Sequence, residues 1–292
     1  MNEDVILLLL GANAGAYALA ASFGEYGIPA VIMDENVPSA FSHTAFVSEV
    51  RRVPGLGYRG ILMRALGDFY EKHAGRTLIL LPTTAALAER VYAKEESLAK
   101  MYLLPLCHIP QSVVGKMPTA LLLTYTDSSG SLHAHYGAVV AACGEEPLAV
   151  VTEAIPEGLL SRVEGKAEIA LYGIDKEGAL FLYSREGTVS PLIAFPSAAD
   201  ASLAEWILSD LVACEPVEES ESVPAAVFSL LPYRRLCPYV LPSEKARVAG
   251  LVKRRLCLSL YPCRGERKTL RARLVLRRYL LENWQKKTKI KK

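Results

Sequence analysis

The chain has 292 residues, of which 51% are hydrophobic and 22% are charged, and its formal net charge is +2. This length and composition indicate a globular chain with room for two or three domains. No apolar run reaches 18 residues, which argues against a membrane-spanning helix. The start, MNEDVILLLL, has acids rather than cations before its apolar run, so we expect a core strand and a cytoplasmic protein.

The near-neutral net charge hides a strong asymmetry between the two ends of the chain. Residues 233–292 carry 19 Lys and Arg against three acids, a balance of +16. Residues 1–232 carry 14 Lys and Arg against 28 acids, a balance of −14. This segregation predicts either a tail that docks on the acidic body or a basic surface for phosphate or anionic lipid.

The first 116 residues predict a β/α domain, because apolar strand-like runs alternate with segments of helical period. We expect a parallel sheet, with Thr83 or Thr84 as the cap of the third helix. The expected strands are residues 5–10, 30–33, 46–50, 77–81 and 101–104, and the expected helices are residues 14–26, 58–74 and 84–97.

The turn after the first strand, Gly11-Ala12-Asn13-Ala14-Gly15-Ala16, precedes the first helix and is not a dinucleotide-binding G-x-G-x-x-G fingerprint. One interpretation is that its backbone amides and the Asn13 side chain accept a carboxylate or phosphate, with Tyr17 bordering the same cleft. The other is that Gly11 and Gly15 only permit a tight turn and close packing. The sequence leaves both open.

Residues 117–222 change to a hairpin pattern. Extended runs flank an Asp-Ser-Ser-Gly turn at 127–130 and an Asp-Lys-Glu-Gly turn at 175–178. A helix is predicted from about residue 200, with Asp200 or Ser202 as its cap. The acidic stretch EPVEESESVP at 215–224 predicts a solvated loop.

Few His and Cys side chains of the chain have the spacing of a metal or catalytic site. His133 and His135 share one face of a strand, a spacing compatible with metal binding, but no third ligand is near, and a solvent-facing polar pair is favoured. Cys107 and His108 point apart on an extended chain, which disfavours thiol catalysis. The six cysteines include no Cys-x-x-Cys pair, so we expect free thiols.

The basic tail, residues 265–292, has leucines and Trp284 interspersed with arginines at helical spacing. Such a helix can dock on the body, lie on an anionic membrane or contact nucleic acid. We favour docking, with membrane contact second. Aromatic residues are not interleaved as a base-stacking platform requires, so no nucleic-acid partner is expected.

The segment GANAGAYALAASFGEYGIPAVIMDEN (11–36) resembles the N-terminal domain of ATP-grasp carboxylate–amine ligases, in particular the D-aspartate-ligase-like group. The likeness continues in short motifs at residues 77–82, 98–105, 121–132 and 259–284. It implies a pre-ATP-grasp domain followed by an ATP-grasp domain. Intact relatives use ATP and Mg²⁺ to activate a carboxylate as an acyl phosphate, which an amine then attacks, as in attaching an amino acid to a bacterial cell-wall precursor.

Two departures from that family put the ATP site in doubt. Only LCHIPQSVVGKMP stands between Pro105 and Thr119, where the family has the subdomain that grips ATP. The family's Mg²⁺ ligands, an Asp and a Glu-x-Asn pair, are hard oxygen donors. One register puts Leu171, Leu182 and Ser184 at those places, and another puts Ser184 and Glu186 there. In one register Arg185 matches the family's arginine that contacts substrate or phosphate.

We therefore expect an α/β fold with a pre-ATP-grasp-like domain (1–116), a shortened ATP-grasp hairpin region (117–222) and a basic helical region (223–292). The favoured function is a pseudoenzyme: a relative without the ATP–Mg site and without a cofactor, which binds a small carboxylate or amino acid or regulates a partner such as an intact ligase. The alternatives are an active ligase and a membrane-surface or scaffold protein that uses the basic tail. The expected ligand-binding residues are Gly11, Asn13, Gly15, Tyr17 and Arg185.

Overall fold

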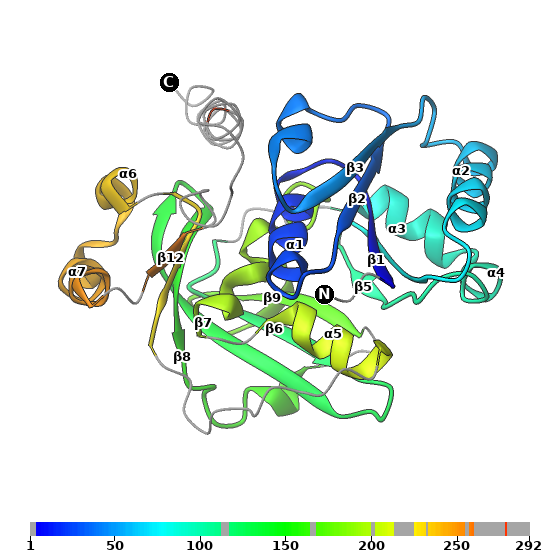
Figure 1. Cartoon of the computed structure of the whole chain (residues 1–292). Coiled ribbons are helices and arrows are strands. Elements are labelled where there is room, and N and C mark those ends of the chain that lie inside the picture. The colour runs from blue at the N-terminus through cyan, green and yellow to red at the C-terminus, as the bar shows by residue number, and fades with distance from the viewer. Residues whose placement is uncertain are drawn as a thin grey trace.

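Two sheets and the helices packed on them form the molecule (Figure 1). The computed structural model describes residues 4–111, 117–163, 168–199, 202–212, 225–231, 233–254, 257–259 and 278. Helix α1 (Ala14–Glu25) lies between the two sheets and belongs to a core that both of them share. The mixed α/β fold that the sequence predicts is confirmed.

The first sheet is parallel and has the strand order β3-β2-β1-β4. Its central strand β1 is buried along its whole length, which explains the unbroken apolar run VILLLL. Alternate side chains of β1 enter different cores: Leu7 and Leu9 face α1, and Leu8 faces the opposite side. The four strands are β1 (Val5–Leu10), β2 (Ala30–Asp34), β3 (Val47–Arg52) and β4 (Thr77–Pro82).

Helices cover both faces of this sheet. Helix α1 packs on one face, and apolar side chains of α2 and α3 form the core on the other. Thr84 caps α3 by accepting from Leu87 N at 3.3 Å, as one of the two predicted caps. The elements are α2 (Arg59–Lys72), α3 (Ala85–Tyr92), α4 (Glu95–Leu98) and the 3-10 helix η1 (Ser39–His43).

Two predicted elements of this domain are wrong in extent. The strand expected at 101–104 makes only an isolated bridge, between Leu103 and Ile79. The helix expected at 84–97 breaks into α3 and α4, because the chain leaves helical geometry at Lys94.

The second sheet is mostly antiparallel and follows the order β10-β9-β6-β7-β8-β11-β12, with β5 beside β9. Both predicted hairpins, β6–β7 and β9–β10, are confirmed. Its strands are β5 (Cys107–His108), β6 (Ala120–Thr126), β7 (Leu132–Cys143), β8 (Glu146–Glu153), β9 (Ile169–Ile174), β10 (Leu180–Leu182), β11 (Val227–Ser229) and β12 (Cys257–Ser259).

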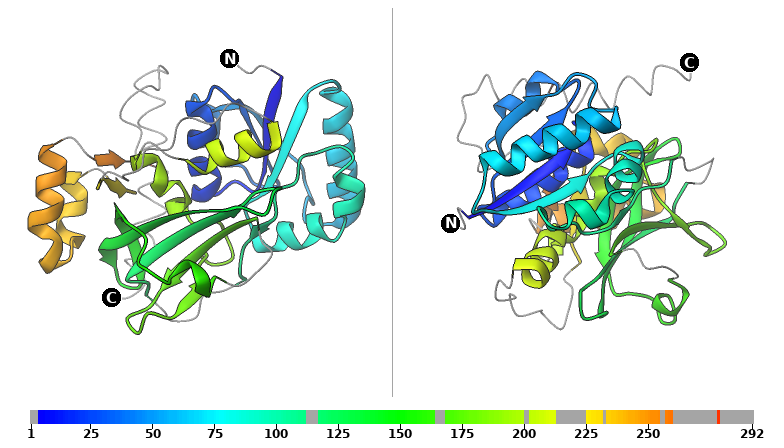
Figure 2. Two further views of the ribbon diagram at one scale, coloured as in Figure 1. Left: turned by 90° about the horizontal axis from the view of Figure 1, so that it is seen from below. Right: turned by 90° about the vertical axis from the view of Figure 1, so that its right-hand side faces the viewer.

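The remaining elements pack on both faces and one end of this sheet: α5 and η3 on the face toward α1, and η2 on the opposite face. Ser202 caps α5 (Leu203–Val212) by accepting from Glu205 N at 3.1 Å, as one of the two predicted caps. Figures 1 and 2 place α6 and α7 at the end of the molecule away from α2. The other elements are α6 (Tyr233–Leu236), α7 (Lys245–Lys253), and the 3-10 helices η2 (Leu160–Arg162), η3 (Pro191–Ala199), η4 (Cys237–Tyr239) and η5 (Pro242–Glu244).

The helical basic tail predicted at 265–292 and its docking on the body lie outside the described residues, apart from residue 278, so both stay predictions. In the part of the chain that the structure describes, no helix is both long and apolar enough to cross a bilayer.

Close contact between α1 and the segment after β10 joins the two sheets. A Cβ atom added at Gly15 would lie 2.2 Å from the carbonyl oxygen of Val189. That distance is far below van der Waals contact, and the neighbour is backbone rather than a flexible side chain. Only glycine therefore fits at this point of α1.

Replacing Gly15 with alanine should lower the free energy of unfolding by about 1–3 kcal/mol, the usual cost of overpacking a well-packed site. The matched control is Gly67→Ala in α2, where an added Cβ meets nothing within 4 Å. That change should stabilise the protein by about 0.5–1 kcal/mol through helix propensity. Urea denaturation of both variants tests the pair, and equal effects would contradict the contact.

Candidate functional site

The carboxyl edge of the parallel sheet is bridged by the turn that follows β10. Ala85 N donates to Gly187 O at 2.7 Å, and Val189 N donates to Thr83 O at 2.9 Å. We call residues 11–17, 83–85 and 185–190 the seam. Ligands of α/β proteins bind at this edge of the sheet, and here part of it contacts the protein's own chain.

Asn13 is the N-cap of α1, and its side chain is engaged in the seam. Its Oδ1 accepts from Ala16 N at 3.0 Å. Its Nδ2 donates to the Thr83 carbonyl at 3.1 Å and to Thr83 Oγ1 at 2.9 Å. The amide nitrogen therefore holds the β1–α1 turn against Thr83 after β4, and the oxygen caps α1.

Gly11 and Asp34 fix the same turn. Gly11 has a φ of +104°, and a Cβ there would lie 2.5 Å from Thr83 Oγ1, so the turn requires glycine. Asp34 Oδ2 accepts from Ala12 N at 2.6 Å, and Asp34 Oδ1 accepts from Glu35 N at 2.6 Å. The carboxylate at the end of β2 thus binds backbone amides.

Tyr17 and Arg185 make their principal contacts away from the turn. Tyr17 is 1% exposed and packs edge-on against Phe46, with ring centroids 6.4 Å apart. Arg185 forms a half-buried ion pair with Glu146 through Nε, and its Nη2 lies 3.4 Å from Glu146 Oε2. All five residues therefore lie in the seam: Gly11, Asn13 and Gly15 lie against Thr83 or Val189, and the side chains of Tyr17 and Arg185 contact Phe46 and Glu146. A ligand-binding role for all five residues stays a prediction.

The positions matched to the family's Mg²⁺ ligands do not offer a suitable donor set. Leu171 is buried on β9, and Leu182 lies on β10. The Ser184 hydroxyl is buried and donates to Pro110 O at 2.7 Å, while Glu186 is exposed. Among the described residues, no group of three His, Cys, Asp or Glu side chains is placed to hold a metal ion. These residues do not fit a Mg²⁺ bridging nucleotide phosphates.

A small pocket lies beside the seam, lined by residues that include Cys107, His108, Tyr183, Ser184 and Ser190. It has room for little more than one water molecule. Burial raises the pKa of the Cys107 thiol to about 12, so the thiol stays protonated at neutral pH. Cys107 is buried and its neighbour His108 is exposed, as expected for adjacent residues on an extended chain.

His133 and His135 join the β6–β7 hairpin to α5. His133 Nε2 lies 3.1 Å from Asp127 Oδ2. The His135 ring stacks on Trp206 of α5, with centroids 4.9 Å apart and planes 7° from parallel. The expectation of a solvent-facing pair is wrong, because both rings are half-buried against this helix.

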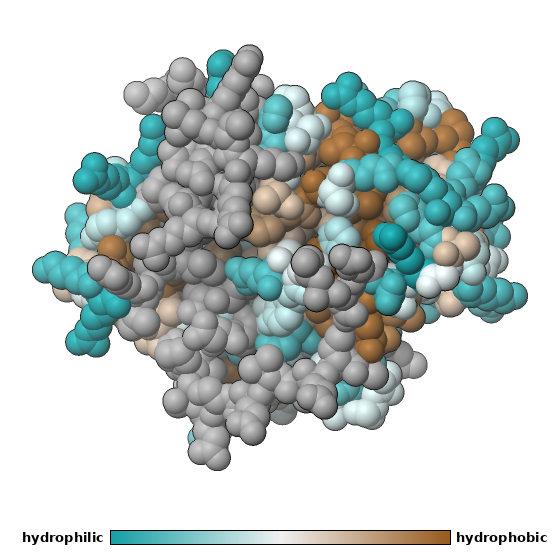
Figure 3. Space-filling model, in the orientation of Figure 1, coloured by the Kyte–Doolittle hydropathy of each residue, from teal (hydrophilic) through white to brown (hydrophobic). Residues whose placement is uncertain are grey.

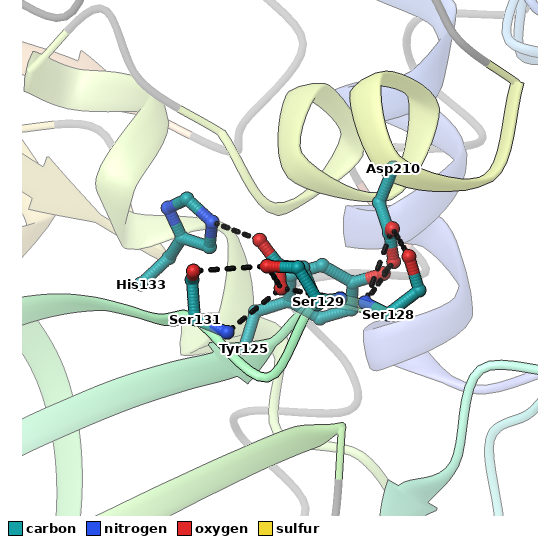
Figure 4. A network of polar contacts seen from close by, with 7 residues as sticks. Tyr125, Ser128, Ser129, Ser131, His133 and Asp210 are labelled. Atoms are coloured by element: carbon teal, nitrogen blue, oxygen red, sulfur yellow. Dashed lines mark hydrogen bonds and ion pairs between the residues drawn. The ribbon is translucent and has the colours of Figure 1, made fainter.

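Asp210 of α5 holds the tip of the same hairpin (Figure 4). It accepts hydrogen bonds from the Tyr125 hydroxyl at 2.6 Å and from Ser128 N at 3.1 Å. Burial, together with the Asp210 carboxylate, raises the pKa of Tyr125. Sequence reasoning did not single out Asp210, because its partner Ser128 is 82 residues away along the chain. This network fastens helix α5 to the hairpin.

The fold is similar to that of N5-carboxyaminoimidazole synthetase from Staphylococcus aureus in complex with ADP, with a TM-score of 0.51 and 8% identity. The match covers 78% of this chain and 82% of that chain. An ADP complex of N5-carboxyaminoimidazole ribonucleotide synthetase has a TM-score of 0.50 and 9% identity over 78% and 81% of the two chains. Biotin carboxylase from Campylobacter jejuni has a TM-score of 0.49 and 9% identity over 76% and 74%.

No protein-family model matches the sequence, and no curated protein matches it either. The likeness to the two synthetases, at 8% and 9% identity, shows the fold alone. The ATP-grasp resemblance is therefore supported at the level of the fold, and the D-aspartate-ligase-like group stays a prediction.

The hydrogen bonds of Asp127, at the tip of the β6–β7 hairpin, predict a loss of stability in acid. The Ser129 hydroxyl, at 2.6 Å, is the strongest of several donors that lower the pKa of Asp127 to about 2. A carboxylate with a lowered pKa stabilises the fold above its unfolded pKa of about 3.9, and this contribution disappears as the pH falls through the folded value. The unfolding free energies of wild type and Asp127→Asn should therefore differ most above about pH 4 and converge toward pH 2. Urea denaturation across this pH range measures both proteins. A difference in unfolding free energy that stays constant with pH would contradict the lowered pKa of Asp127.

Proposed function

We propose that this protein is a divergent relative of the ATP-grasp carboxylate–amine ligases that lacks the ATP–Mg²⁺ site. It acts as a non-catalytic protein that binds a small carboxylate or amino acid, or regulates a partner such as an intact ligase. The observation that carries the proposal is the donor set at the expected metal positions, where leucines and an internally bonded Ser184 replace hard oxygen ligands.

The short connection between β5 and β6 supports the same conclusion. Strand β5 ends at His108 and β6 begins at Ala120, which leaves no length for a nucleotide-gripping subdomain. Phosphoryl transfer depends on cations and a metal that neutralise charge in the transition state. Two of the fold relatives were crystallised with ADP. The proposal is that this chain has lost nucleotide binding.

A small carboxylate fits best at the seam. Helix α1 has no acidic residue in its first turn, and its N-terminus lies at the carboxyl edge of the parallel sheet. Amides at a helix N-terminus favour a negatively charged group. Gly11 and Gly15 let Thr83 and the Val189 carbonyl approach this turn closely, and Asn13 orients it.

Titration calorimetry with ATP–Mg²⁺ should show a dissociation constant in the millimolar range or weaker. Each missing charge-assisted contact removes roughly 1.5–3 kcal/mol, so the loss of several removes micromolar affinity. Parallel titrations with amino acids and small dicarboxylates should give the tighter response. Micromolar, magnesium-dependent ATP binding with release of ADP would instead establish the active ligase.

For any carboxylate found to bind, Asn13→Asp should weaken affinity about tenfold or more, because it places a negative charge at the seam. Aspartate keeps the N-cap acceptor for Ala16 N, so helix α1 remains capped. Asn36→Asp makes the same chemical change at an exposed position and should alter affinity little. Calorimetry measures both, and melting curves check that both fold. Equal affinities would move the binding site elsewhere.

A further inference from the structure

The start of helix α2 presents two apolar side chains to solvent. Among the described residues, the exposed large hydrophobic side chains are Tyr58 (74%), Ile61 (38%) and Leu132 (38%). Tyr58 and Ile61 lie together: a Cβ at Gly55 would be 2.8 Å from Ile61 Cδ1 and 3.2 Å from Tyr58 Cδ2. On the face in Figure 3, apolar atoms reach the surface among hydrophilic ones over the β3–α2 part of the molecule.

Cations surround this pair. Residues 50–67 contain four arginines and no acid, although the first 232 residues as a whole are acidic. Arg59 follows Tyr58, Arg64 lies one helical turn beyond Ile61, and both are exposed. Neither forms an ion pair with another described residue. We define the Tyr58 patch as Arg52, Tyr58, Arg59, Ile61 and Arg64.

Neighbouring elements add one more cation and several acids. The Arg90 guanidinium of α3 approaches Gly57, where an added Cβ would lie 3.2 Å from Nη1. The acids are Glu89, beside Arg90, Asp68, one turn beyond Arg64, and Asp34, the register partner of Arg52, whose carboxylate accepts from Ala12 N. The patch itself carries three arginines and no carboxylate.

We propose that the Tyr58 patch binds the surface of an anionic membrane. A tyrosine ring suits the headgroup region, a neighbouring isoleucine inserts shallowly, and arginines attract acidic lipid headgroups. This surface is built from the folded body and is separate in sequence from the basic tail.

The size of the patch favours a membrane over an acidic protein. A stable protein interface buries about 800 Å² on each partner around a packed centre. Two apolar side chains on a convex helix start cannot supply that. Stable membrane attachment typically combines two weak signals, and the sequence carries a second one in its basic residues 264–292.

The test measures sedimentation of the full-length protein with lipid vesicles. The vesicles contain phosphatidylcholine alone or phosphatidylcholine with about 30 mol% phosphatidylglycerol, whose headgroup is anionic. Wild type should partition onto the anionic vesicles only. Tyr58→Ser/Ile61→Ser should weaken partitioning about tenfold, because the inserted apolar surface is lost. Arg59→Gln/Arg64→Gln should weaken it and make it less sensitive to salt.

Leu132→Ser is the matched control, because Leu132 has the same exposed fraction as Ile61, 38%, and lies on β7 of the second sheet, away from α2. It should leave partitioning unchanged, and melting curves verify that each variant folds. If the double Ser variant binds anionic vesicles as wild type does, or if wild type does not bind them, the proposal is overturned.

Discussion

The close approach of the Val189 carbonyl to Gly15 is the contact on which the two halves of the molecule depend. It lets α1 pack simultaneously on the parallel sheet and on the segment covering the antiparallel one, so a single core contains side chains from both. Backbone hydrogen bonds from Ala85 to Gly187 and from Val189 to Thr83 hold the same junction. Because the nearest neighbour of Gly15 is a backbone carbonyl, no Cβ fits there without displacing the chain.

This junction explains how the polar groups at the sheet edge are used. Asn13 and Asp34 lie at the edge where α/β folds bind ligands. Here they satisfy backbone donors and acceptors of the turn and of the residue after β4. A buried backbone group without a partner would cost more than the side chain gains by remaining free. The turn is thus preorganised, with helix α1 directed at the edge of the sheet, which is the arrangement our proposed carboxylate ligand requires.

The antiparallel half is fastened by side chains rather than by backbone. Asp210 and Trp206 of α5 hold the β6–β7 hairpin through Tyr125, Ser128 and His135. Such a network contributes rigidity, and its members have partners within the protein. In the proposed function, this half of the molecule is a stable platform beside the seam.

The sequence by itself determined the elements: the buried β1 run, the alternation of strand and helix to β4, and both hairpin turns. It gave two candidates for each of two helix caps, of which the structure uses Thr84 and Ser202. These follow from local periodicity and turn chemistry, which neighbouring residues encode. It also identified the candidate turn at residues 11–17, but it left open whether Asn13 serves a ligand or the fold. Only the tertiary structure decided the partners of Asn13, the pairing of Arg185 with Glu146, and the stacking of His135 on Trp206. Each of these joins residues far apart along the chain, and no local pattern specifies which distant groups will meet.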